Sequence, residues 1–167
     1  MLERLRGYYA ERQVGSTLFD AVAASASGEM ATLPDFDRRL KAIAEFAKLP
    51  EAPALAAANK RIRNILRKSE DQIPAEVDES KLVDAAELEL HAAVAAALAD
   101  TAPLLGVRDY VGVLRRLAAL RAPVDAFFDG VMVMADDAAL RRNRLALLKR
   151  LADRFAAVAA VEHLSNA

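Results

Sequence analysis

The segment from Leu120 to Leu148 constrains the fold more than any other part of the chain. Pro123 lies near its start, and the fixed φ and missing N–H of proline suit the first turn of a helix. Apolar side chains then follow at the spacing i, i+3, i+4, i+7, at Val124, Phe127, Phe128 and Val131. This spacing predicts a helix with one apolar face. Gly130 and the Asp136–Asp137 pair interrupt the pattern, and a second helix is expected from about Ala138. We therefore predict a helical hairpin on which the rest of the chain packs.

Arg144 falls inside the apolar stripe of that second helix when residues are projected at about 100° each. The stripe consists of Leu140, Leu147, Leu148, Leu151, Phe155 and Val158. A guanidinium is too costly to bury without a partner, so Arg144 needs a carboxylate, a backbone carbonyl or a ligand phosphate. We expect a structural ion pair with an aspartate of the preceding helix rather than a ligand contact.

The rest of the chain also favours helix. Alanine and leucine dominate, aromatic residues are few, and β-branched residues do not form runs. Asp84 and Glu87 form a capping box that starts a long alanine-rich helix, expected to run to about Ala102 and to be closed by Pro103 and Gly106. The prediction is an all-α bundle of seven to eight helices. Residues 1–32, which include the Ser25–Gly28 loop, form N-terminal helices leading into a domain of residues 33–167.

Composition excludes several classes of function. The chain has no cysteine, which removes disulfides and thiol-based metal sites, and its two histidines have no metal-ligand spacing. No phosphate-binding glycine loop or catalytic triad pattern is present, so we predict no metal site, no cofactor and no catalysis for this chain alone. We expect no membrane span, because no stretch of 18 apolar residues occurs. The charged start of the chain is unlike a signal peptide, and we expect a cytoplasmic protein.

The first candidate binding surface is a basic helix. Of the nine residues from Lys60 to Lys68, five are basic and none is acidic. A helix that only meets solvent usually mixes charges of both signs, so a single-sign face indicates an anionic partner. The equally weighted alternative is an ordinary wet surface whose acids come from a neighbouring helix. The candidate RNA-binding residues here are Asn59, Lys60, Arg61, Arg63, Asn64 and Arg67.

The second candidate surface is the start of the last helix. Arg141 and Arg142 point away from its apolar stripe and could reach phosphate, and Asn143 could read a base because its amide both donates and accepts. Asn143 could equally be a surface asparagine. Tyr110 is a weaker candidate for stacking on a base.

Several strings together resemble one family. They are Ala58-Asn59-Lys60-Arg61-Ile62 with Asn64-Ile65-Leu66, the run PVDAFFDGVMVMADDAALRRNRLALL, and the shorter MLERLRGYY, DFDRRLKA and Leu49-Pro50-Glu51. The chain resembles, from Met1 to about Leu164, the C-terminal region of the β subunit of bacterial glycyl-tRNA synthetase. That region is an all-helical anticodon-binding domain named for an Asp-Ala-Leu-Arg motif. The matching stretch here, Asp137-Ala138-Ala139-Leu140-Arg141, has one extra alanine.

The resemblance implies a tRNA-binding domain of glycine–tRNA ligase that recognises the anticodon of glycine tRNA. The implied partners are glycine tRNA, the α subunit and the remainder of the β subunit, with no membrane. Catalysis, which uses ATP and Mg²⁺, is implied on the α subunit. Lys60, Arg63, Asn64 and Arg67 would form one wall of the site, and Arg141, Arg142 and Asn143 would supply the other wall or grip the RNA backbone.

The alternative function is a helical protein–protein interaction module without an RNA-binding role, in which the helix from Asp84 to Ala102 docks on a partner. A contiguous basic cleft would favour RNA, whereas a large exposed apolar patch would favour a protein partner.

Overall fold

The computed structural model describes residues 2–11, 15–25 and 33–165. Within these residues the chain forms eight α-helices, two short 3₁₀ turns and no strand, as the sequence predicted. The helices are α1 (Leu2–Glu11), α2 (Ser16–Ser25), α3 (Leu33–Ala47), α4 (Ala52–Lys68), α5 (Ala85–Gly106), α6 (Tyr110–Ala118), α7 (Arg121–Gly130) and α8 (Ala138–Ala156), and the 3₁₀ turns are η1 (Glu79–Lys81) and η2 (Val161–Leu164). Beyond Ser25, the predicted Ser25–Gly28 loop lies outside the described residues.

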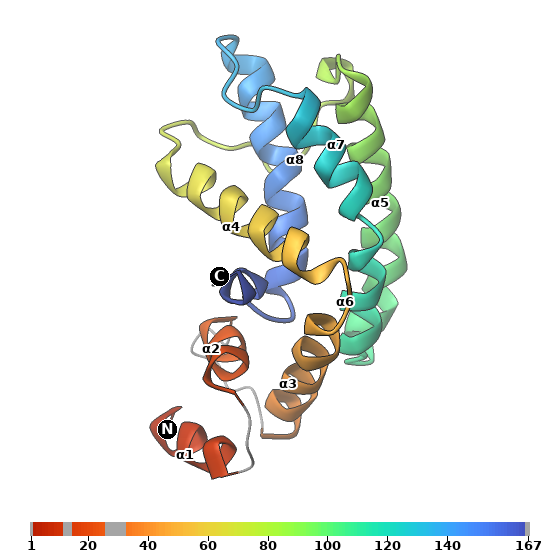
Figure 1. The fold of residues 1–167 in the computed structure, drawn as a ribbon. Helices are drawn as coiled ribbons and strands as arrows, with labels where there is room; N and C mark the ends of the chain where they lie inside the picture. Colours follow the sequence, from red (N-terminus) through yellow and green to blue (C-terminus); the bar gives the residue numbers. More distant parts are fainter. Residues whose placement is uncertain (1, 12–14, 26–32, 166–167) are drawn as a thin grey trace.

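Helix α8 forms the centre of the molecule. Figure 1 shows it between α4 on one side and α5 with α7 on the other. Its middle is buried on every side, because all six residues from Asn143 to Leu148 have little or no exposed surface. The predicted apolar stripe therefore lies within a broader buried surface.

The N-terminal helices pack on this core through a cluster of aromatic rings. Tyr9 of α1, Phe19 of α2 and Phe36 of α3 lie with ring centroids 5.3 to 6.0 Å apart. A backbone hydrogen bond of 2.9 Å from the Ala160 N–H to the Ala21 carbonyl joins α2 to the segment after α8. These contacts hold α2 against the segment that follows α8, and α1 packs on α2.

Helix starts follow the predicted caps. The Asp84 N–H donates to the Glu87 carboxylate at 3.2 Å as half of the expected capping box. The Asp137 carboxylate accepts from the N–H groups of Ala139 and Leu140, so the predicted start of α8 is confirmed.

Helix α5 ends at Gly106, one of the two residues predicted to close it, about one turn beyond the predicted Ala102. The helix runs through Pro103 to Gly106, because a proline removes only one backbone donor and the exposed turn around it tolerates the loss. The chain reverses instead at Arg108, whose φ of 59° lies in the left-handed region.

Helix α5 also has the length and a mean hydropathy of 1.3 that would let it cross a membrane. Its inner face, however, packs in the domain and includes the buried Glu87.

Candidate nucleic-acid interface

Helix α4 presents a polar stripe beside its buried face. Leu55, Ala56, Asn59 and Ile62 are buried in the core. The positions i, i+3, i+4 and i+7 from residue 60 form the polar stripe, which consists of Lys60, Arg63, Asn64 and Arg67. The basic face that the sequence indicates therefore lies beside the buried face of this helix.

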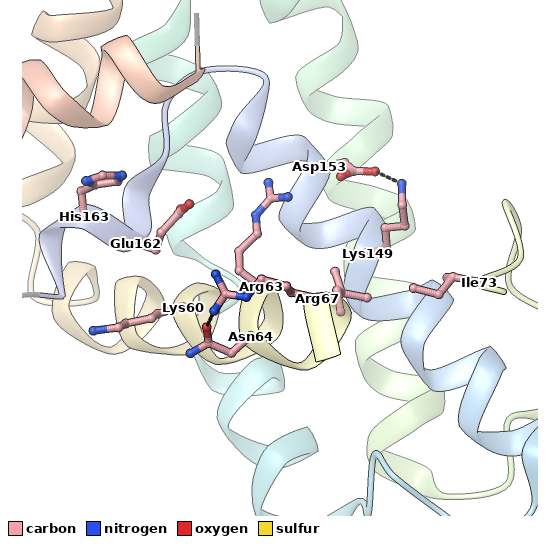
Figure 2. A pocket seen from close by; sticks show the side chains of 10 residues that line it. Lys60, Arg63, Asn64, Arg67, Ile73, Lys149, Asp153, Glu162 and His163 are labelled. Atoms are coloured by element: carbon pink, nitrogen blue, oxygen red, sulfur yellow. Dashed lines mark hydrogen bonds and ion pairs between the residues drawn. The ribbon is translucent and has the colours of Figure 1, made fainter. Parts of the chain in front are cut away.

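A cleft of about 730 Å³ opens along this stripe. We call it the basic cleft. Its far walls come from Lys149 and Asp153 of α8, from Glu162 and His163 of η2, and from Ile73 of the loop after α4. Figure 2 shows these segments around the stripe, with Lys149 and Asp153 joined by an ion pair of 2.7 Å. The lining holds four cations, Lys60, Arg63, Arg67 and Lys149, against two carboxylates.

The cations of the basic cleft differ in solvent exposure and in how firmly hydrogen bonds hold their side chains. Arg63 is half-buried, and its Nη2 donates to the Ala152 carbonyl of α8 at 3.2 Å, so its guanidinium is held across the cleft. Lys60 and Arg67 are exposed. Arg67 donates to the Asn64 side-chain carbonyl, so this bond holds two residues of the stripe together and does not use the Asn64 amide N–H groups.

Asn59 does not belong to this surface. It is only 2% exposed, and its Nδ2 donates to the Glu162 carboxylate at 2.7 Å. The side chain fastens η2 to α4 and so builds a wall of the cleft without facing it.

The second predicted cluster holds a loop in place. Arg141 makes two hydrogen bonds to the Asp71 carboxylate, at 2.6 and 3.2 Å, and donates to the Ala135 carbonyl at 2.9 Å. The Asp71 contact raises the pKa of Arg141 and, outweighing partial burial, lowers the pKa of Asp71. Arg142 is about half exposed and lies 3.8 Å from the same carboxylate.

Asn143 is 3% exposed and bonded to the backbone of Asp78, accepting from its N–H at 2.7 Å and donating to its carbonyl at 3.0 Å. These bonds tie the segment after α4 to α8. Arg141, Arg142 and Asn143 do not line the basic cleft; the wall from α8 begins two helical turns later, at Lys149.

Arg144 is buried with the partners that its position requires. Its Nη2 lies 2.9 Å from Glu87 and 3.1 Å from Asp84, and its Nη1 donates to the Met132 carbonyl at 2.6 Å. The hydrogen bond to Glu87 raises the pKa of Arg144 despite its burial. The sequence predicted a partner aspartate on the preceding helix, and this prediction is wrong. The acids lie at the start of α5, because the side of α8 that carries Arg144 packs against α5.

Tyr110 is unavailable for stacking on a base. It is 5% exposed, its hydroxyl donates to Asp35 at 2.6 Å, and the Arg39 guanidinium covers its ring at 4.5 Å. Arg39 also donates to the Ala157 and Val158 carbonyls at 2.8 and 3.0 Å, so this network joins α3 and α6 to the end of α8.

Comparison with known proteins bears on what such a cleft does. Residues 55–161, which span α4 to the start of η2, match the family described as the DALR anticodon binding domain. The chain belongs to this family. The match includes the basic stripe of α4 and the Asp137–Arg141 stretch, where Asp137 caps α8 and Arg141 holds Asp71.

The family assignment is supported by relatives across the whole chain. The chain is 60% identical over 166 residues to the glycine–tRNA ligase β subunit of Xanthomonas campestris pv. campestris, and 53% identical to that of Xylella fastidiosa. It is 50% identical over 164 residues to the Pseudomonas aeruginosa subunit. The alignments cover 98–99% of this chain but 23–24% of the relatives, so the chain spans about a quarter of their length. The resemblance read from the sequence is confirmed.

The residues of the DALR domain that sequence reasoning missed come from distant segments. Glu162 and His163 line the basic cleft but follow the stripe by about 100 residues. No local pattern marks them. Among residues 2–11, 15–25 and 33–165 no group of three or more His, Cys, Asp or Glu side chains could hold a metal ion.

Proposed function

We propose that this chain is the tRNA-binding domain of a glycine–tRNA ligase β subunit and that it binds the anticodon loop of glycine tRNA. The basic cleft along α4 is the observation that carries this proposal. Within an otherwise neutral chain, with a net charge of −1, it gathers four cations around one hollow. The printed name of the relatives and the family description supply the kind of RNA.

The cleft offers two kinds of contact. Lys60 and Arg67 are exposed and placed to neutralise backbone phosphates, which position an RNA without reading its sequence, whereas Lys149 is paired with Asp153. Arg63 is held by the Ala152 carbonyl and can present donors to a base edge. Glycine codons begin with GG, so the anticodon ends in two cytosines, each with acceptors at O2 and N3 and a donor at N4. Unpaired loop bases expose these edges.

Arg141, Asn143 and Asn59 are left out of the proposed contact set, because each is hydrogen-bonded within the protein. Arg142 is half exposed and could reach a phosphate from outside the cleft.

Glycyl-tRNA synthesis would need parts that lie outside this chain. We propose that the α subunit carries the ATP- and Mg²⁺-dependent chemistry in the cytoplasm, and that the remainder of the β subunit adds tRNA contacts. Linking a weak anticodon contact to other sites raises its effective concentration, so modest affinity in this domain is sufficient.

The test is a titration of the chain with a glycine-tRNA anticodon stem-loop and with a copy in which both anticodon cytosines are changed, at two salt concentrations. We expect the native loop to bind more tightly, and both Arg63→Ala and added salt to weaken it. Arg115→Ala on α6, outside the cleft, is the matched control. Equal binding to both loops would leave only phosphate contact and overturn anticodon recognition.

One observation favours the second candidate function, protein docking. The outward face of α5 is exposed and apolar, with alanines at positions 85, 92, 95, 96 and 99 and with Leu88 at 50% exposure. Failure of the chain to bind either loop at low salt would favour this function over RNA binding.

A further inference from the structure

A second hollow lies on the neighbouring face of α4, where this helix meets α7. Its volume is about 490 Å³, and we call it the α4–α7 hollow. It is lined by Ala54, Ala57, Ala58 and Arg61 of α4 and by Asp125, Phe128 and Asp129 of α7. Because Lys60 and Arg61 are consecutive residues, the basic cleft and this hollow lie on adjacent faces of one helix.

The hollow contains a cation–π pair. The Arg61 guanidinium lies 4.4 Å from the ring centroid of Phe128. This contact positions the Arg61 guanidinium on one surface of the hollow, where its N–H groups are available as hydrogen-bond donors. The three alanines of α4 are small and leave the approach to this surface open.

Charges of both signs line the hollow without joining. Arg61 makes no ion pair with Asp125 or Asp129 within the described residues, although all three line the same space. Asp125 lies 3.5 Å from Arg121 on its own helix. Opposite charges that share a hollow and do not meet leave room for a ligand that accepts on one side and donates on the other.

We propose that the α4–α7 hollow binds one cytosine of the anticodon. Arg61 would donate to the O2 and N3 acceptors, and Asp129, with Asp125 beside it, would accept from the N4 amino group. In the same orientation uracil would turn its O4 toward a carboxylate and its N3–H toward Arg61, so both contacts would become repulsive. This inference rests on the proposed function and adds to it a site that selects one base, whereas the basic cleft supplies most of the phosphate contacts.

The experiment uses three stem-loops: the native one and two in which a single anticodon cytosine is replaced by uracil. We expect the native chain to bind at least one uracil loop about tenfold more weakly than the native loop. Asp129→Asn should reduce this preference to about twofold or less at one cytosine and leave it intact at the other, because an asparagine amide can also donate to O4 of uracil. Asp125→Asn tests the second carboxylate in the same way.

Asp100→Asn, on α5 and exposed, is the matched control and should change neither preference. Thermal unfolding of each variant checks that the fold is kept. If the native chain prefers cytosine but both Asp125→Asn and Asp129→Asn keep the full preference at both positions, the hollow is not the base site and the proposed function stands. If the native chain shows no preference at either position, both proposals fail.

Discussion

The Arg144 guanidinium donates to the Glu87 carboxylate at 2.9 Å although the two residues lie 57 positions apart in the sequence. Arg144 is 5% exposed and Glu87 fully buried, so this contact joins α8 to the start of α5 inside the core. Two of its polar atoms, Glu87 Oε2 and Arg144 Nε, have no hydrogen-bond partner among the described residues. The pair therefore recovers only part of the hydration that its groups lose on burial.

Removing one partner of this pair should cost more stability than replacing both. We expect Glu87→Ala to lower the free energy of unfolding by about 3 kcal/mol, because Arg144 stays buried without its closest acid. The double variant Glu87→Leu, Arg144→Met should recover most of that loss. Urea unfolding measures both. A double variant less stable than Glu87→Ala would contradict this account.

Acid should weaken the contact between α3 and α6. Burial alone would raise the pKa of Asp35, but hydrogen bonds from Tyr110 and Arg39 and the charges of Arg39 and Arg108 outweigh it and hold this pKa below its usual value. A carboxyl with a lowered folded-state pKa stabilises the fold above its unfolded pKa, near about 3.9, and loses that contribution as pH falls through the folded value. The stability difference between the native chain and Asp35→Asn should therefore be largest near neutral pH and shrink below about pH 4. A difference that is constant from pH 7 to pH 2 would argue against this contribution of Asp35.

We expect Asn143 to contribute to the stability of the fold and not to RNA binding. Asn143→Ala leaves the Asp78 N–H without its partner and removes one of two donors to the Asp78 carbonyl, which still accepts from the Lys81 N–H. We expect a loss of about 1–3 kcal/mol in unfolding free energy. Preference for the native stem-loop, measured well below the unfolding transition, should not change. Arg142→Ala, half exposed, should cost less than about 0.5 kcal/mol. If Asn143→Ala instead abolished the preference for the native stem-loop and left the unfolding free energy unchanged, Asn143 would be an RNA contact.

Salt dependence should identify the phosphate contacts. Lys60→Ala and Arg67→Ala should each reduce the slope of log K against log salt by about 0.7 to 1. Both should weaken binding to the native and changed loops by the same factor, because phosphate contacts carry no base information. An unchanged slope in both variants would show that the RNA phosphates contact other residues than Lys60 and Arg67.

The sequence predicted what depends on nearby residues. Asp84 with Glu87 and the Asp136–Asp137 pair mark helix starts because a cap acts within one turn, and the basic stripe of α4 follows from helical spacing alone. Asn59 and Asn143 could not be placed in this way. Each is an amide at the edge of an apolar face, and burial was decided by Glu162 and Asp78, which lie 103 and 65 residues away. The partner of Arg144 was missed for the same reason.

The hydrogen bond between Asn59 and Glu162 also orders events during protein synthesis. At about 5–20 residues per second, the 103 residues between them take roughly 5 to 20 s to translate. During that interval α4 has been made, but η2, one wall of the basic cleft, has not. A nascent chain can thus present the cations of α4 before the cleft around them is complete. The basic cleft acquires its full set of walls only when η2 packs on α4.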